Sequence, residues 1–193
     1  MAVEVAQLTT ERLVLRQWQD SDNAPFARMN ADADVMQWFA NPLTPEESAM
    51  MVQRLSTMIN HFGWGVWALE VPGVADFIGF VGLALTVMPV PFSPFIEVGW
   101  RLDKAHWGNG YAPEGARASL AYAFDTLKQR EVVSMTTVGN LKSRRVMDKI
   151  GLHRDEADDF DLPRLPIGHP IRPHVLYRIT DSEWREQNTD ELA

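Results

Sequence analysis

A strand-forming segment that runs into a double-glycine turn and then a helix constrains the fold of this chain more than any other feature. Phe95–Leu102 is rich in aromatic and β-branched residues, Gly108-Asn109-Gly110 follows, and helical periodicity extends from about 112 to 128. Glycine allows sharp turns and lets a ligand approach the backbone N–H groups. Because the first amides of a helix lack intrahelical partners and lie at the positive end of its dipole, this arrangement can seat a pyrophosphate. An ordinary strand–turn–helix connection has the same local pattern, so the segment alone leaves both interpretations open.

The remaining sequence predicts strands and helices that alternate along the chain. Strands are predicted at 11–16, 64–71, 77–85, 94–103, 132–138 and 175–180, and helices at 24–29, 45–63, 112–128 and 141–150. Thr44 and Pro45 are typical of a helix start, and the face predicted to be buried carries Met51, Leu55, Met58 and Ile59. The order of elements predicts an α/β (α+β) fold, with helices packed on a mixed sheet, in a single domain over residues 1–193.

Composition excludes several classes of function. The chain has no cysteine, so disulfides, thiolate metal sites and cysteine nucleophiles are excluded. Its five histidines lack the helical spacing of a zinc site, and no metal is expected. A net charge of −8 argues against a nucleic-acid binder and favours a cationic partner such as an amine. No apolar run approaches the ~20 residues of a membrane span and no secretory signal is visible, so we expect a cytoplasmic protein without membrane contact.

The chain carries four motifs in order, at residues 11–16, 108–114, 140–143 and 149–152. Together they resemble the GNAT family of N-acyltransferases, in particular the branch that modifies ribosomal-protein N-termini (RimJ/RimL-like). Residues 108–114 are similar to the family's acetyl-CoA pyrophosphate loop. Residues 140–143 and 149–152 resemble the later signature of that branch, and residues 11–16 resemble the family's first strand. The resemblance extends from Thr10 to Thr180.

This resemblance implies a GNAT fold, with a twisted, mostly antiparallel sheet, helices on both faces and a V-shaped opening between the fourth and fifth strands. It also implies that the amides of Gly108–Ala112 hold the pyrophosphate of acetyl-CoA and that the strand at 99–102 pairs with the pantetheine arm. Asn140 would contact the pantetheine or adenosine side, and Ser143 would lie near the thioester sulfur. Asn140 is also well placed to cap the following helix, and the two roles can coexist. The cofactor-binding residues implied in this way are Gly99, Trp100, Arg101, Leu102, Trp107, Gly108, Asn109, Gly110, Tyr111, Ala112, Asn140 and Ser143.

The implied reaction is direct attack of a primary amine on the thioester carbonyl, with acetyl as the acyl group. It needs an acceptor for the amine proton and a proton for the departing thiolate. Glu97 is the first candidate base, acting through water, and the alternative is a solvent-facing strand glutamate. Many family members place a tyrosine as general acid where this chain has Met147, so Ser143 or a water is the expected proton donor.

Candidate residues for binding the amine acceptor are Trp38, Phe39, Glu97 and His174. Trp38 and Phe39 follow the first helical region, where the family often places substrate-facing residues, and the alternative is packing in the core. His174 could act as a base because the pKa of histidine lies near neutrality, or it could be a hydrogen-bonded strand residue. Acidic residues clustered at 155–161 could line an entrance for a cationic amine or form a solvated loop.

Two other functions compete with an acetyl-CoA-dependent N-acetyltransferase acting on a protein N-terminus or a small amine. A non-catalytic acyl-CoA-binding module on the same fold would bind the thioester without releasing thiol. A generic nucleotide-binding protein is disfavoured, because the chain lacks the downstream acidic ribose contact and the strand order of that class. Homodimers are common in the resembled family, but no segment of this sequence predicts one.

Overall fold

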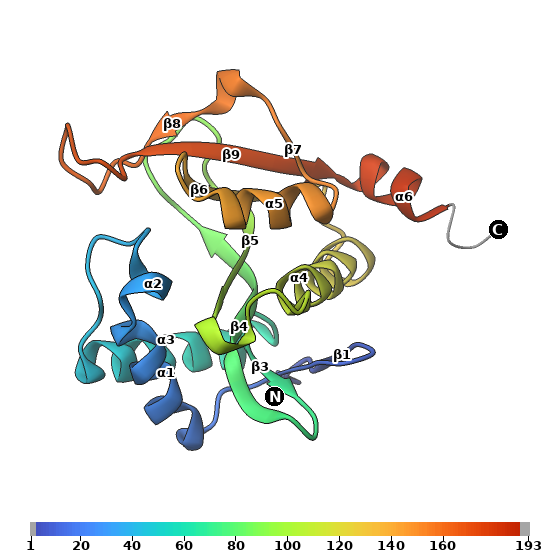
Figure 1. The fold of residues 1–193 in the computed structure, drawn as a ribbon. Coiled ribbons are helices and arrows are strands. Elements are labelled where there is room, and N and C mark those ends of the chain that lie inside the picture. The colour runs from blue at the N-terminus through green and yellow to red at the C-terminus, as the bar shows by residue number, and fades with distance from the viewer. Residues whose placement is uncertain (1–2, 190–193) are drawn as a thin grey trace. The chain divides into compact units, whose positions relative to one another are not determined.

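Two compact units, each built from two segments of the chain, make up residues 3–189, the part that the computed structural model describes (Figure 1). The first comprises the residues up to Leu83 together with Gly99–Ser119, and the second comprises Ala84–Val98 together with the residues from Leu120 on. Three elements begin in one unit and end in the other: β4 (Ala75–Thr86), β5 (Phe95–Leu102) and α4 (Tyr111–Ala121). A single domain over the whole chain stays a prediction.

The first unit combines antiparallel strands with a group of helices. Its other elements are β1 (Leu8–Thr9), β2 (Val14–Arg16), the 3₁₀ turn η1 (Asp20–Asp22), α1 (Asn23–Ala31), α2 (Ala33–Met36), α3 (Pro45–Phe62), β3 (Val66–Val71) and the 3₁₀ turn η2 (Lys104–His106). The pairs β1–β2, β2–β3 and β3–β4 are all antiparallel. Helix α1 contacts both α2 and α3 (Figure 1).

Helix α3 begins and ends where its local sequence predicts, but it buries a different face. The Thr44 hydroxyl accepts from the Glu47 amide at 3.2 Å, while the Glu47 carboxylate accepts from the Thr44 amide at 2.8 Å, which is a capping box. Gly63 ends the helix in the left-handed conformation with φ of 80°. The buried residues are Ser48, Val52 and Ile59, whereas Met58 is 40% exposed, so the predicted face was partly wrong. Packing against α1, where Asn30 donates to the Ser48 hydroxyl at 3.1 Å, selects the buried side.

The second unit is built around a pair of long strands. Its elements are the π-helical turn η3 (Tyr122–Thr126), β6 (Glu131–Thr137), α5 (Leu141–Lys149), β7 (His153–Arg154), the 3₁₀ turn η4 (Glu156–Asp158), β8 (Phe160–Asp161), β9 (Pro173–Thr180) and α6 (Asp181–Thr189). Strands β6 and β9 are antiparallel from Glu131↔Thr180 to Thr137↔His174, and β7 and β8 also pair with β9. Strand β5 pairs in parallel with β6, with Glu97 opposite Val133. The predicted mixed, mostly antiparallel sheet is therefore confirmed.

One helix of the second unit, α6, lies outside the predicted elements. It follows β9 directly (Figure 1), and its one buried residue, Trp184, stacks on Phe124 with ring centroids 5.8 Å apart. Phe124 belongs to the predicted helix 112–128, in which Ala116, Leu120, Ala123 and Phe124 are fully buried, whereas Leu127 on the same apolar stripe is only half-buried. None of the helices within residues 3–189 is long and apolar enough to cross a membrane.

Candidate active site

The glycine loop before α4 is exposed, and its two glycines adopt a backbone conformation that other residues rarely adopt. Gly108 has φ of 81° and Gly110 has φ of 82°, both in the left-handed region. A Cβ atom built on Gly108 would meet no other atom within 4 Å. The loop therefore leaves open space beside its backbone, directly before the first turn of a helix of 11 residues. Glycine conformation, open space and helix start together fit an anionic group.

Hydrogen bonds and an ion pair join this loop and the start of α4 to Thr10 and Arg12. Arg12 donates through Nε to Glu114 Oε2 at 2.7 Å and through Nη1 to the Asn109 carbonyl at 3.0 Å. The Thr10 hydroxyl donates to Glu114 Oε1 at 2.6 Å, and the Arg12 guanidinium lies 5.0 Å from the centre of the Tyr111 ring. Burial works to raise the pKa of Glu114, but the hydrogen bonds from Thr10 and Arg12 hold it below its usual range. Arg12 thus holds the loop from 97 residues before Asn109 in the sequence, a contact that no local motif identifies.

Strand β5, which leads into the loop, lies close to β4 near Ile78 and Gly79. Asp103 donates its amide to the Ile78 carbonyl at 2.9 Å, and a Cβ on Gly79 would collide with the Arg101 carbonyl. Trp107 Nε1 donates to the Leu102 carbonyl at 2.8 Å, which turns the chain from strand to loop. A Cβ on Gly99 would meet nothing within 4 Å, so space remains beside the middle of β5. Leu102 is buried, Trp100 and Ala112 are half-buried, and the roles predicted for these residues toward acetyl-CoA stay predictions.

Asn140 and Ser143 lie at the start of α5 in the second unit. Asn140 Oδ1 accepts from the Ser143 amide at 3.3 Å, and its Nδ2 donates to the Thr136 hydroxyl at 2.9 Å. The alternative of a helix cap is thus confirmed for Asn140, and its contact with a cofactor stays a prediction. Ser143 is half-buried, whereas Met147, at the family's tyrosine position, is 1% exposed in the core of this unit.

Glu97 is half-buried, and within residues 3–189 its carboxylate is not paired with a cation at hydrogen-bond distance. Its Oε2 accepts from the Thr86 hydroxyl at 3.2 Å. The residue is thus only partly exposed to solvent, and its role as a base stays a prediction. Burial raises the pKa of Glu97 from 4.5 to about 7, and the Thr86 hydrogen bond and the charge of Arg164 oppose the rise. A carboxyl with this pKa can exchange protons near neutral pH.

His174 lies near the same cation as Glu97. Its Nδ1 is 3.0 Å from the Arg172 carbonyl, which assigns the proton of the neutral ring to Nδ1 and leaves Nε2 as an acceptor. Burial lowers the pKa of His174, the Arg172 carbonyl opposes this, and the charge of Arg164 lowers it further. The charge of Arg164 thus acts on both Glu97 and His174, and in each case it is a smaller effect than burial.

An apolar cluster lies on the strands that carry these two residues. Phe95, Val133 and Leu176 form its buried part, and half-buried side chains from the 88–92 loop and from β8 pack against it. The Phe92 ring is 5.2 Å from that of Phe95 and 5.3 Å from that of Phe160. Low polarity beside Glu97 is consistent with the burial that raises its pKa.

Trp38 and Phe39 follow α2. The Phe39 ring lies against the guanidinium of Arg101, a residue that the sequence had assigned only to cofactor binding. Trp38 is half-buried and Phe39 is 39% exposed. The Arg101 guanidinium lies 4.0 Å from the centre of the Phe39 ring, and Nη1 of Arg101 donates to Asn30 Oδ1 at 2.8 Å. No local pattern could have connected Asn30 with a strand residue 71 positions later.

The acidic cluster at 155–161 is largely engaged with arginines. Asp158 accepts from Arg178 at 2.5 Å, Asp161 accepts from Arg172 at 3.0 Å, and Asp159 is paired with Arg154. These pairs neutralise most of the charge that an entrance for a cationic amine would need. The structure thus favours a structural role for this segment.

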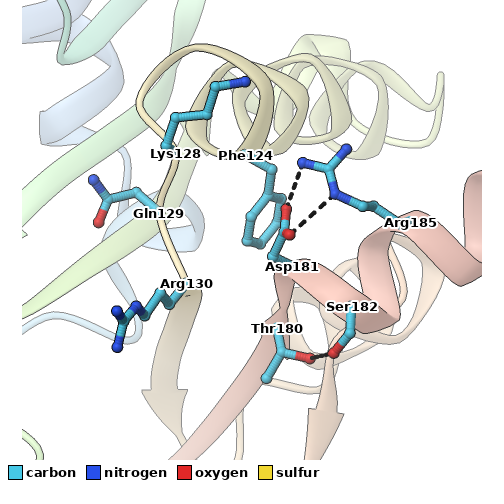
Figure 2. Close-up of a pocket in the computed structure, with 8 residues that line it drawn as sticks. All are labelled: Phe124, Lys128, Gln129, Arg130, Thr180, Asp181, Ser182 and Arg185. Carbon is cyan, nitrogen blue, oxygen red and sulfur yellow. Dashed lines mark hydrogen bonds and ion pairs between the residues drawn. The ribbon is translucent and has the colours of Figure 1, made fainter.

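A hollow of about 360 Å³ in the second unit contains none of the predicted site residues. Figure 2 shows Asp181 of this hollow paired with Arg185 across one turn of α6, while the Arg130 side chain extends away from them. Its lining is Phe124, Lys128, Gln129, Arg130, Thr180, Asp181, Ser182 and Arg185. Within the described residues, no three His, Asp or Glu side chains gather as a metal site requires.

Comparisons with known proteins agree with this geometry. The family described as "Acetyltransferase (GNAT) domain" matches residues 12–153. The FsC-acetyl coenzyme A-N(2)-transacetylase of Aspergillus fumigatus is 33% identical over 166 residues, which are 81% of this chain and 68% of the relative. A crystal structure of a GNAT-family acetyltransferase from Bacillus anthracis has a TM-score of 0.76 at 23% identity, covering 92% of this chain and 99% of that one. A ribosomal-protein-S5-alanine acetyltransferase from Vibrio fischeri has a TM-score of 0.72 at 18% identity, covering 93% and 98%.

These matches confirm the predicted GNAT fold and the predicted class of enzyme. The family match covers the glycine loop, Glu97, Asn140 and Ser143, and ends before His174. The solved structures, at their low identity, support the fold alone. The chain therefore belongs to the GNAT family of acetyltransferases, as an acetyl-CoA-dependent N-acetyltransferase that acts on amines.

Proposed function

We propose that the enzyme transfers acetyl directly from acetyl-CoA to a primary amine, on a small molecule or a protein N-terminus, with Glu97 as general base. The observation that carries the proposal is the half-buried Glu97 carboxyl, whose pKa of about 7 suits proton transfer near neutrality. An acyl-CoA-binding module without catalysis would have no use for such a group, because binding a thioester needs no proton acceptor. Membership in the ribosomal-protein branch is part of the proposal, supported by the motifs at 108–114 and 140–152.

In the proposed reaction, the amine nitrogen attacks the thioester carbonyl carbon and the carbon–sulfur bond breaks. Glu97 takes the proton that the amine nitrogen loses, either directly or through one water. The thiolate takes up a proton from the Ser143 hydroxyl or from water. Met147 cannot supply it, because a thioether has no proton to donate and the side chain is buried.

The loop from Gly108 to Ala112 is proposed to hold the pyrophosphate of acetyl-CoA. The left-handed glycines, the open space beside Gly108 and the following helix start all suit a doubly anionic group. The hydrogen bond from Arg12 to the Asn109 carbonyl would keep the loop in this conformation before the ligand binds. Such preorganisation lowers the entropic cost of binding.

Further properties of the enzyme are part of this proposal. The absence of cysteine supports a reducing, cytoplasmic setting, and the net charge of −8 supports an acceptor that carries positive charge and argues against nucleic-acid partners. A homodimer is compatible with the family. The printed name of the Aspergillus relative places its acceptor at an N(2) atom, which supports an amine rather than an alcohol here.

Thermal unfolding with acetyl-CoA, NAD or ATP tests the cofactor. At one hundred times its dissociation constant, acetyl-CoA should add about 2.7 kcal/mol to the stability, a shift of a few degrees. Screening amines for release of free thiol then tests catalysis. A shift with no thiol release from any amine would leave a binding module, and no shift at millimolar acetyl-CoA would contradict the assignment altogether.

Replacing Gly108 by valine should raise the dissociation constant of acetyl-CoA at least about tenfold, equivalent to about 1.4 kcal/mol. The new side chain would fill the open space beside the loop, and the left-handed φ would strain a β-branched residue. Gly73→Val is the matched control, because Gly73 has φ of 76° and equally open surroundings in the turn between β3 and β4. Calorimetric titration of both variants measures the difference. Equal affinity in the two would place the pyrophosphate elsewhere.

A further inference from the structure

Among the residues that the structure describes, Arg101 is a half-buried cation without an anionic partner. Its Nη1 donates to the neutral amide of Asn30 at 2.8 Å, and its guanidinium lies 4.0 Å from the centre of the Phe39 ring and 5.4 Å from that of Phe80. Its Nε is buried and has no hydrogen-bond partner. Burial lowers the pKa of Arg101 to about 10, and no acidic side chain within residues 3–189 counters this effect. A buried N–H group without an acceptor is uncommon and costly.

The unused donors of Arg101 form one edge of the guanidinium. Nε and Nη2 point in nearly parallel directions, and this edge matches the two oxygens of a carboxylate. The chain shows the same pairing elsewhere, because Arg154 engages both oxygens of Asp159 through its Nε and Nη2. At Arg101, no carboxylate within the described residues occupies the equivalent edge.

Arg16, the other arginine of the first unit that is not exposed, has its anions within the protein. Arg16 is paired with Asp22 and Glu70, and all of these partners come from the same unit. Arg101 differs in that an amide and two aromatic rings hold it in place while its charge stays uncompensated. A protein that fixes a cation in this way and supplies no counterion is suited to receive the anion from a ligand.

We propose that Arg101 binds the carboxylate of the acceptor, so that the amine acetylated by this enzyme belongs to an amino acid or another small amino-carboxylate. The inference rests on the proposed function, since it names the class of acceptor for that reaction. Asn30 would hold the guanidinium in position, and Phe39, which is 39% exposed and lies over the guanidinium, would border the acceptor. A planar carboxylate needs the two parallel donors that this edge offers, whereas a CoA phosphate would be served by the helix start after Gly110.

Matched pairs of acceptors test this proposal on the wild-type enzyme. Thiol release from acetyl-CoA is measured with a panel of α-amino acids and with the amide of each, for example L-leucine and L-leucinamide. We expect kcat/KM to be at least about tenfold higher for the acids, from two hydrogen bonds to a charged group. The amides have the less basic amines, which favours them in a reaction that needs a neutral amine, so a preference for the acids is a stringent result.

Variants of Arg101 then assign the preference to this side chain. Arg101→Met should remove the preference for acids, mainly by raising KM for the acids at least about tenfold. Arg101→Lys keeps the charge but loses the two-donor edge, so it should retain part of the preference. Arg185→Met is the control, because Arg185 is an exposed arginine that pairs with Asp181.

Each outcome separates this inference from the proposed function. If amides or simple alkylamines react as well as the acids, or if only amines without a carboxylate react, the acceptor assignment is wrong while the acetyltransferase stands. If Arg101→Met instead loses affinity for acetyl-CoA, the anion at Arg101 belongs to the cofactor. If acetyl-CoA binds but no amine releases thiol, the proposed function fails and this inference fails with it.

Discussion

Replacing Glu97 by glutamine is expected to lower kcat/KM by roughly 10²–10⁴-fold, the usual contribution of a positioned general base. In the wild-type enzyme the rate should rise with pH through about 7, because the pKa of Glu97 is about 7 and only the ionised carboxylate accepts the amine proton. Each pH unit below that value should reduce the rate about tenfold until another group limits it. At higher pH the ionisation of the amine acceptor itself continues the rise. The glutamine variant should lack the part of this rise that is centred near pH 7, since its side chain does not titrate, and should keep the part that comes from the amine acceptor.

The free energy of unfolding provides a second test of Glu97. If Glu97 stabilised the fold, its replacement would lower this free energy, whereas we expect the replacement to raise it at high pH. The pKa of Glu97 is raised in the folded state, so the fold favours the protonated carboxyl. The resulting penalty is absent below pH 4.5, grows between 4.5 and 7, and reaches at most about 3 kcal/mol above pH 7. Glu97→Gln should therefore be more stable than wild type at pH 8 and similar to it at pH 4.

Urea unfolding at both pH values and pH–rate profiles of both proteins make these measurements. Glu131→Gln is a suitable control, because Glu131 of β6 pairs with Arg178 of β9 and has no proposed role in proton transfer. It should keep the wild-type rate and pH profile. A Glu97→Gln variant with the wild-type pH profile would remove Glu97 from the mechanism, whatever its effect on stability.

The predictions that proved correct rest on local chemistry. A capping box at Thr44, a glycine at the end of α3 and two glycines before α4 act within a few residues, so the sequence carries their consequences directly. The glycine loop was the strongest of these signals. Its two left-handed residues and the helix behind it were predictable, although the family resemblance was needed to connect them with acetyl-CoA.

The features that could not be predicted depend on contacts between distant segments. Whether a strand glutamate faces water depends on what covers it, and Thr86 and Arg164 around Glu97 come from other elements. Helix α6 has one buried residue, Trp184, so its stability comes from packing on Phe124 rather than from an amphipathic pattern. The missing counterion of Arg101 is likewise visible only when all its neighbours are known.

Replacing Arg16 by methionine should have the largest effect on stability, a loss of about 3–5 kcal/mol. Arg16 is 6% exposed and Asp22 is 1% exposed, and they are joined by two hydrogen bonds of 2.8 and 2.9 Å. Arg16 also donates to Glu70 at 2.9 Å and to the Asp76 carbonyl at 2.6 Å. Methionine would fill the volume but leave Asp22 buried and unpaired, and this uncompensated charge is the source of the loss.

Urea unfolding of Arg16→Met, of Arg185→Met and of the double variant Arg16→Met/Asp22→Asn measures this effect. The exposed pair of Arg185 with Asp181 should contribute less than about 1 kcal/mol. Asp22→Asn removes the charge and keeps an acceptor for the Gln19 amide, which now donates to Asp22 at 2.8 Å. The double variant should therefore recover part of the stability that the single variant loses. A loss below about 1 kcal/mol for Arg16→Met would mean that Asp22 finds another partner or reaches water, and that β2, η1 and β3 are not held together by this cation.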